Sequence, residues 1–239
     1  MGDAGLHEDD DLGFQANQDA FTVLVTGFGL PPLRAKDVNA RSGYYDLTTD
    51  LSPVRILIHP EPIRVTYKTV RELVPKFWEN EYGGHKIDAA IHIGMAGARP
   101  MYQLERLAHR TGYKSTDVDG EMLEDEGEGK HDENWIWNGL PDSLESDLDI
   151  PNVYLRWKEL CSPDVDVRIS EDPGRYLCDF IYYSSLSTLL KQNRPRKVCF
   201  FHVPADASDT AIQRGREIAI NLIRSIAESE ISKRRGVAK

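Results

Sequence analysis

The chain has 239 residues, of which 40% are hydrophobic and 28% are charged, a composition typical of globular proteins. Its net charge of -10 argues against binding to nucleic acid or to an anionic membrane surface, because both require a basic face. No run of about 18 apolar residues predicts a membrane span, and the first residues lack the pattern of a signal peptide. Three cysteines without CxxC spacing indicate a reducing, cytoplasmic location.

Short apolar runs that stop at glycine or proline predict buried strands, and segments with helical spacing lie between them. The expected strands cover residues 21–29, 54–60, 86–97, 165–170 and 197–204, and the expected helices cover residues 65–80, 172–190 and 208–230. Pro75 should weaken the first helix or end it early. An acidic segment, residues 1–20, and a basic segment, residues 231–239, are expected to form solvated tails.

The helix expected from residue 172 should have Asp172 as its N-cap and Pro173 in its first turn. Cys178 would then lie in the second turn, where the helix dipole has little influence on a thiol. For the last helix, Ser208 is the expected cap.

Residues 113–150 differ in composition from the rest of the chain. They are rich in glycine and acidic residues, and Trp135 and Trp137 follow the acidic run. We expect a long loop or hairpin laid over the domain, since long irregular loops in compact domains are usually lids or binding loops. The acidic run lacks the regular oxygen spacing of a calcium-binding EF-hand loop, so a solvated charged segment is favoured.

Strands that are apolar throughout and alternate with helices predict a mostly parallel sheet that is covered on both faces. We therefore expect a single α/β domain over residues 21–230 with an open sheet. Binding and catalytic sites in such sheets form beyond the carboxyl ends of the strands. The segments TGFG, HIGMAG and FHVP fall at such ends, so they should converge in space.

Cys178 and His202 are the candidate pair for chemistry. Each of them alone is more often a packing residue. Together, a cysteine near a helix start and a histidine at the end of the next strand can meet at the edge of the sheet. There an imidazole converts a thiol into a thiolate nucleophile.

A third group is needed to orient the imidazole. Glu105, which lies between apolar residues, is one of many acidic candidates, and its alternative role is a surface carboxylate paired with Arg99 or Arg106. The histidines lack HExxH spacing and the glycine-rich segments match neither a P-loop nor a GxGxxG pattern, so no metal and no organic cofactor is indicated.

Four segments of the chain, taken in order, resemble the pyroglutamyl-peptidase I family of cysteine peptidases, which remove N-terminal pyroglutamate from peptides. These segments are VLVTGFG with VNARS after it, IHIGMAG leading to LERLAHRTGYK, ISEDPGRYLCDFIYYSSL, and FFHVP. The segment around Cys178 is the most specific. The separation of Cys178 from His202 along the chain also resembles that of the family.

The resemblance implies that Cys178 is the nucleophile and His202 the general base, and it selects Glu105 as the orienting acid. It also implies a single-domain α/β/α sandwich that needs no cofactor and acts on small peptides with N-terminal pyroglutamate. Three further residues would border the pocket for the lactam ring: Phe28, Tyr176 and Leu177.

The chain departs from the family pattern at Leu30–Leu33, where a second aromatic residue would stand, at Arg110, which replaces an asparagine, and at Pro173, which replaces an alanine. Two other functions therefore stay open. One is a thiol hydrolase or amidase for another blocked or cyclic N-terminus, and the other is a catalytically silent protein that keeps the pocket. A third alternative is an α/β domain whose cysteine and histidine only pack. A homo-oligomer is left open.

Overall fold

The computed structural model describes residues 20–28, 46–48, 53–97, 99–126 and 131–237. The expected acidic tail, up to residue 19, and the segment Leu30–Leu33 lie outside these residues. None of the described helices is both long and apolar enough to cross a membrane.

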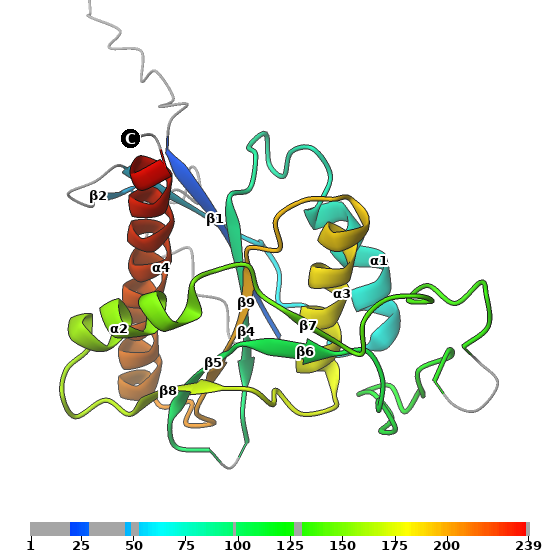
Figure 1. Cartoon of the computed structure of the whole chain (residues 1–239). Helices are drawn as coiled ribbons and strands as arrows, with labels where there is room; N and C mark the ends of the chain where they lie inside the picture. Colours follow the sequence, from blue (N-terminus) through cyan, green and yellow to red (C-terminus); the bar gives the residue numbers. More distant parts are fainter. Residues whose placement is uncertain (1–19, 29–45, 49–52, 98, 127–130, 238–239) are drawn as a thin grey trace, which may run out of the picture.

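In the described part of the chain, seven strands form a central sheet in the order β2-β3-β1-β4-β9-β5-β8 (Figure 1). The strands are β1 (Phe21–Gly27), β2 (Asp46–Thr48), β3 (Pro53–Ile58), β4 (Ala89–Met95), β5 (Tyr102–Glu105), β8 (Val167–Ser170) and β9 (Val198–Val203). Four neighbouring pairs are parallel, whereas β2 runs antiparallel to β3 and β5 antiparallel to β9. The expected mostly parallel open sheet is confirmed, with two reversals.

Helices cover both faces of this sheet. On one face lie α1 (Tyr67–Phe77) and α3 (Leu177–Lys191), and on the other lie α2 (Ile150–Leu160) and α4 (Asp209–Val237) (Figure 1). Neighbouring residues of one strand therefore enter different cores: in β9, Phe200 packs on the α3 side and Phe201 on the α4 side. This two-sided burial explains why the strands are apolar throughout.

The start of α3 differs from the sequence expectation. The helix begins at Leu177 with Tyr176 as its N-cap, so Asp172 is not its cap. Asp172 instead closes a turn, in which its Oδ1 accepts the N–H of Gly174 at 3.0 Å and Gly174 has a φ of +88°. The positive φ at Gly174 is incompatible with a right-handed helix. Cys178 is consequently the second residue of α3 and lies in its first turn.

The other two expected helices also differ in their bounds: α1 is shorter than the expected 65–80, and α4 runs further than the expected residue 230. Pro75 lies inside α1, which continues to Phe77, and the cap proposed for α4 is confirmed because the Oγ of Ser208 accepts the N–H of Ala211 at 3.3 Å. α4 continues to Val237, so residues 231–237 extend the helix rather than forming a tail. The sequence pattern gave no indication of α2, β5 or the two-stranded sheet of β6 (Leu107–His109) and β7 (Ser143–Glu145).

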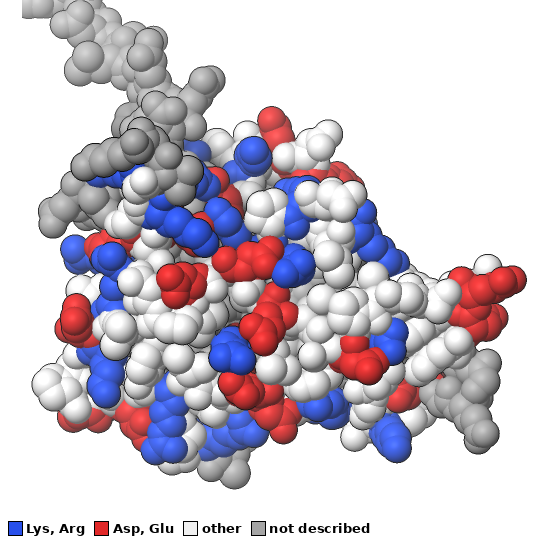
Figure 2. Space-filling model, in the orientation of Figure 1, with Lys and Arg blue, Asp and Glu red and all other residues white. Residues whose placement is uncertain are grey.

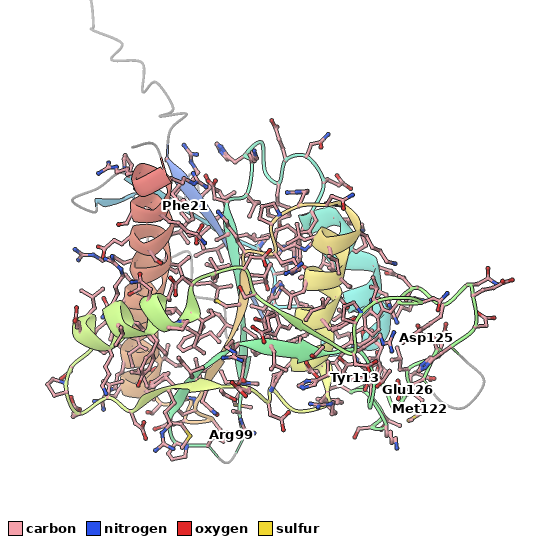
Figure 3. All side chains as sticks on the ribbon, in the orientation of Figure 1. Phe21, Arg99, Tyr113, Met122, Asp125 and Glu126 are labelled. Carbon is pink, nitrogen blue, oxygen red and sulfur yellow. The ribbon has the colours of Figure 1, made fainter. Side chains whose placement is uncertain are left out.

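Residues 113–142, described except for 127–130, form an irregular segment that we call the acidic arm. Figure 2 shows Asp and Glu side chains at its protruding end, and Figure 3 places Tyr113, Asp125 and Glu126 along it. The arm is anchored by aromatic packing, with the ring of Trp137 centred 4.6 Å from that of Tyr183 in α3. The Arg71 guanidinium of α1 lies 4.3 Å from the centre of the Trp137 ring. The long loop expected over residues 113–150 is interrupted before its end, because β7 and the start of α2 fall within that range.

Candidate active site

Three strand ends meet at one edge of the sheet, as the sequence predicted. β1, β4 and β9 are adjacent, and their register pairs Gly94 with His202. The N–H of Phe28, directly after β1, donates to the carbonyl oxygen of Ile93 at 3.0 Å. The carboxyl ends of these parallel strands therefore bring the three motifs side by side.

Cys178 reaches this edge from the first turn of α3. A Cβ atom placed on Gly94 would lie 3.0 Å from the Cys178 Sγ and 2.6 Å from the Cζ of Phe200. Only a glycine leaves enough room there for the thiol to sit against β4. Paired residues of parallel strands project to the same face of a sheet, so His202 and the thiol both lie beside position 94.

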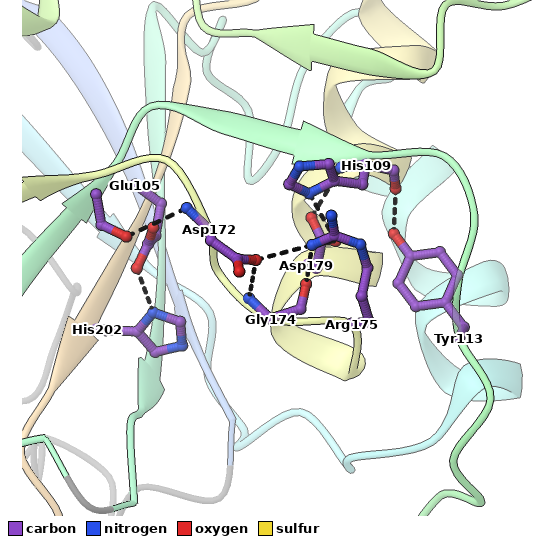
Figure 4. A network of polar contacts seen from close by, with 9 residues as sticks. Glu105, His109, Tyr113, Asp172, Gly174, Arg175, Asp179 and His202 are labelled. Atoms are coloured by element: carbon purple, nitrogen blue, oxygen red, sulfur yellow. Dashed lines mark hydrogen bonds and ion pairs between the residues drawn. The ribbon is translucent and has the colours of Figure 1, made fainter.

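Glu105 and His202 are hydrogen-bonded inside the domain, with 2.8 Å between His202 Nδ1 and Glu105 Oε1 (Figure 4). Glu105 is 0% exposed, so the alternative of a surface carboxylate is excluded. The antiparallel pairing of β5 with β9 places the two side chains on the same face. A carboxylate accepts hydrogen bonds, which assigns the proton to Nδ1 and leaves Nε2 free.

The electrostatic environment keeps the Cys178 thiol protonated. Burial raises its pKa to about 12, and the negative charges of Glu105 and Asp179 act in the same direction. A hydrogen bond from the Cys178 backbone N–H opposes them. No side chain caps the first turn of α3, so its backbone N–H groups are the ones that favour an anion at this place.

The residues expected to border a pocket join one hydrophobic cluster with Cys178. Phe28 is buried, while Tyr176 is partly exposed and packs edge-on against Tyr67, with ring centres 6.5 Å apart. The Leu177 side chain is fully buried in the core, so a ligand would meet this residue only through its backbone.

Arg110, which departs from the family pattern, lies between β6 and the start of the acidic arm. Its guanidinium donates to the carbonyl oxygen of Leu140 and to Asp142, and it lies 5.3 Å from the centre of the Trp135 ring. Arg110 therefore links the residues directly before the arm to its carboxyl end.

A second histidine–carboxylate pair, His109 and Asp179, was not found from the sequence (Figure 4). The signal that points to it is an acidic residue directly after the candidate nucleophile.

Comparison with known proteins agrees with this geometry. Residues 21–219 match the family model described as pyroglutamyl peptidase. Pyroglutamyl-peptidase 1 of Mus musculus is 34% identical over 191 residues, which cover 76% of this chain and 78% of the relative. Pyrrolidone-carboxylate peptidase of Pyrococcus furiosus is 29% identical over 185 residues, covering 76% and 80%.

The fold is shared with a solved structure. The crystal structure of pyrrolidone carboxyl peptidase from the hyperthermophile Pyrococcus furiosus superposes with a TM-score of 0.60 at 24% identity, and the match covers 88% of this chain and 99% of that one. The matched region contains the paired Glu105 and His202 as well as Cys178. The chain therefore belongs to the pyroglutamyl peptidase family.

Proposed function

We propose that this protein is a cysteine peptidase that removes N-terminal pyroglutamate from peptides, with Cys178 as nucleophile, His202 as general base and Glu105 as the orienting acid. The observation that carries the proposal is the buried 2.8 Å hydrogen bond between Glu105 and His202 at the strand end where Cys178 packs against Gly94. This is the arrangement that acyl transfer to a thiol needs.

The first step forms a bond between the Cys178 Sγ and the carbonyl carbon that joins pyroglutamate to the next residue. A thiol whose pKa is about 12 does not ionise by itself at neutral pH, so its proton passes to His202 Nε2 as the sulfur attacks. The Glu105 carboxylate, fixed at Nδ1, stabilises the imidazolium that results. The carbonyl electron pair moves onto oxygen, and backbone N–H groups in the first turn of α3 stabilise this oxyanion.

Collapse of the tetrahedral intermediate breaks the bond between carbon and nitrogen. His202 gives its proton to the departing amine, which leaves as the shortened peptide, and pyroglutamate stays bound to Cys178 as a thioester. His202 then takes a proton from a water molecule as the water oxygen attacks the thioester carbon. The carbon–sulfur bond breaks, the thiol regains its proton, and free pyroglutamate is released.

The selectivity for pyroglutamate follows from the character of the site. The lactam ring is uncharged and compact, with apolar faces that suit contact with Phe28 and Tyr176. An unblocked glutamyl or glutaminyl N-terminus would have to bring a charged amine into this apolar cluster. Desolvation of such a charge without a partner is strongly unfavourable.

The proposal is tested by fluorophore release from pyroglutamyl-aminomethylcoumarin under reducing conditions, with glutaminyl-aminomethylcoumarin as the matched substrate. We expect cleavage of the pyroglutamyl substrate alone, and its loss in a folded Cys178→Ala variant. Cleavage by that variant would refute the mechanism. A folded native chain that leaves the pyroglutamyl substrate intact but cleaves another blocked N-terminus would support the alternative thiol hydrolase. A native chain that cleaves none of these substrates would support the silent binding protein.

A further inference from the structure

Asp179, the residue after Cys178, is fully buried and takes no part in the mechanism described above. Its Oδ1 accepts the backbone N–H of His109 at 2.9 Å, and its Oδ2 lies 3.1 Å from His109 Nδ1 (Figure 4). The Nη1 of Arg175 lies 3.6 Å from the same Oδ2. Burying a carboxylate costs desolvation free energy even when it has two cationic or polar partners, so a buried carboxylate at this position should have a function.

The first of two consequences is mechanical. The first turn of α3 carries the nucleophile but has no side-chain cap, and helix ends without such partners open first. Asp179 stabilises this turn in another way than a cap does, because its hydrogen bond links the turn to His109 at the end of β6. The turn must be held firmly, because the Cys178 Sγ lies so close to Gly94 that even a Cβ atom there would crowd it.

The second consequence is electrostatic. Burial raises the pKa of the Cys178 thiol, and the negative charges of Glu105 and of the neighbouring Asp179 act in the same direction. Burial also raises the pKa of Asp179 itself, whereas its bonds from His109 and the charge of Arg175 lower it. Several ionisable groups surround this pair. On or beside β6 and α3 they are His109, Tyr113, Arg175, Tyr176 and Tyr182. From the sheet, Glu105 of β5 acts on the thiol, and His202 of β9 is bonded to Glu105.

We propose that Asp179 is a positioning residue for the nucleophile. It anchors the first turn of α3 to His109 so that Cys178 stays beside His202, and its charge, next to the buried thiol, adds to the burial that disfavours a thiolate. This inference rests on the proposed role of Cys178 and adds how that residue is held and controlled.

The test compares Asp179→Asn with Asp179→Ala by the rate at which iodoacetamide alkylates Cys178, measured by mass spectrometry near pH 8. Cys161 and Cys199 are buried and serve as slow internal references. Asparagine keeps an oxygen for the His109 N–H but removes the charge, so we expect alkylation to become about three- to tenfold faster.

With pyroglutamyl-aminomethylcoumarin, Asp179→Ala should lower kcat about 10- to 100-fold with little change in KM, because the thiol is displaced. Asp179→Asn should retain most of kcat.

Glu230→Gln is the matched control. Glu230 is also a buried carboxylate with a cationic partner, Lys197 at 2.5 Å, but it lies in α4 on the other face of the sheet. We expect the native alkylation rate and kcat in this variant. An unchanged alkylation rate in Asp179→Asn would overturn the proposal, and so would a folded Asp179→Ala variant with native kcat. Alkylation needs no substrate, so a native chain that alkylates but does not cleave would refute the proposed function and leave the alkylation result for Asp179 standing.

Discussion

Two buried histidines face the same side of the sheet from adjacent strands, His92 in the middle of β4 and His202 near the end of β9. Both ring nitrogens of His92 bond to hydroxyls, with Nδ1 2.7 Å from the Thr26 Oγ1 and Nε2 2.8 Å from the Ser185 Oγ. His202 has a carboxylate on one nitrogen, with 2.8 Å between its Nδ1 and the Glu105 Oε1. Burial alone therefore does not mark a catalytic histidine.

The difference lies in the partners and in the position along the strand. Burial lowers the pKa of His92 to about 3, so this ring stays neutral and links β1, β4 and α3. A carboxylate partner, in contrast, stabilises a positive imidazolium, which a general base must become during the reaction. The strand end also gives His202 access to the thiol, whereas the middle of β4 is closed by packing.

The largest effect is expected from His202→Asn. Loss of the proposed general base should lower kcat/KM about 1,000-fold, and the free energy of unfolding should fall by about 1–3 kcal/mol because the buried Glu105 loses its partner. The measurement is hydrolysis of pyroglutamyl-aminomethylcoumarin together with urea unfolding. The same substitution at His92 is the matched control. Activity within tenfold of the native chain in His202→Asn would remove the basis of the comparison.

A smaller effect is expected from Gly94→Ala. Gly94 lies in β4, beside β9, at the position where Cys178 packs against the sheet. The added methyl group would lie 2.6 Å from Phe200 and 3.0 Å from the Cys178 Sγ, so the thiol or the ring must move. We expect kcat to fall about 10- to 100-fold and the free energy of unfolding to fall by about 1–3 kcal/mol. Gly215→Ala in α4, where an added Cβ meets nothing closer than 3.9 Å, is the control. Native kcat in Gly94→Ala would show that the thiol does not depend on this contact.

The smallest effect on activity is expected from His92→Asn. Thr26 and Ser185 would lose a buried partner, so the free energy of unfolding should fall by about 2–4 kcal/mol while kcat per folded molecule stays near native. Urea unfolding and active-site titration measure the two quantities. A loss of kcat as large as that of His202→Asn would show that both histidines serve the reaction.

The pH dependence of stability sharpens the same comparison. Unfolded His92 titrates near its ordinary pKa of 6.5, and its pKa in the folded protein is about 3. The unfolded state therefore binds a proton first as the pH falls from 6.5 towards 3, and the native chain loses stability over this range by at most about 1.4 kcal/mol per pH unit. His92→Asn should lose this part of the slope. An unchanged slope would mean that His92 does not remain neutral.

Several parts of the site follow from local sequence signals. The strands at β1, β4 and β9 were predicted because strands buried on both faces read as continuous apolar runs. Cys178 and His202 are predicted as a pair because one lies near the start of a helix and the other at the end of the next strand. The resemblance to a family adds Glu105. The start of α3 was predicted wrongly, because Asp172 and Pro173 form a typical cap pattern but Gly174 turns the chain before the helix can begin.

The sequence by itself determined the alternation of strands and helices, the strand ends that carry the site and the residue types available for chemistry, since these depend on neighbours along the chain. Only the tertiary structure decided that β5 runs antiparallel to β9, which buries Glu105 against His202, and that Asp179 meets His109. Both contacts join residues about 70 or more positions apart. Strand pairing and side-chain packing fix such contacts, and neither is encoded in a local pattern.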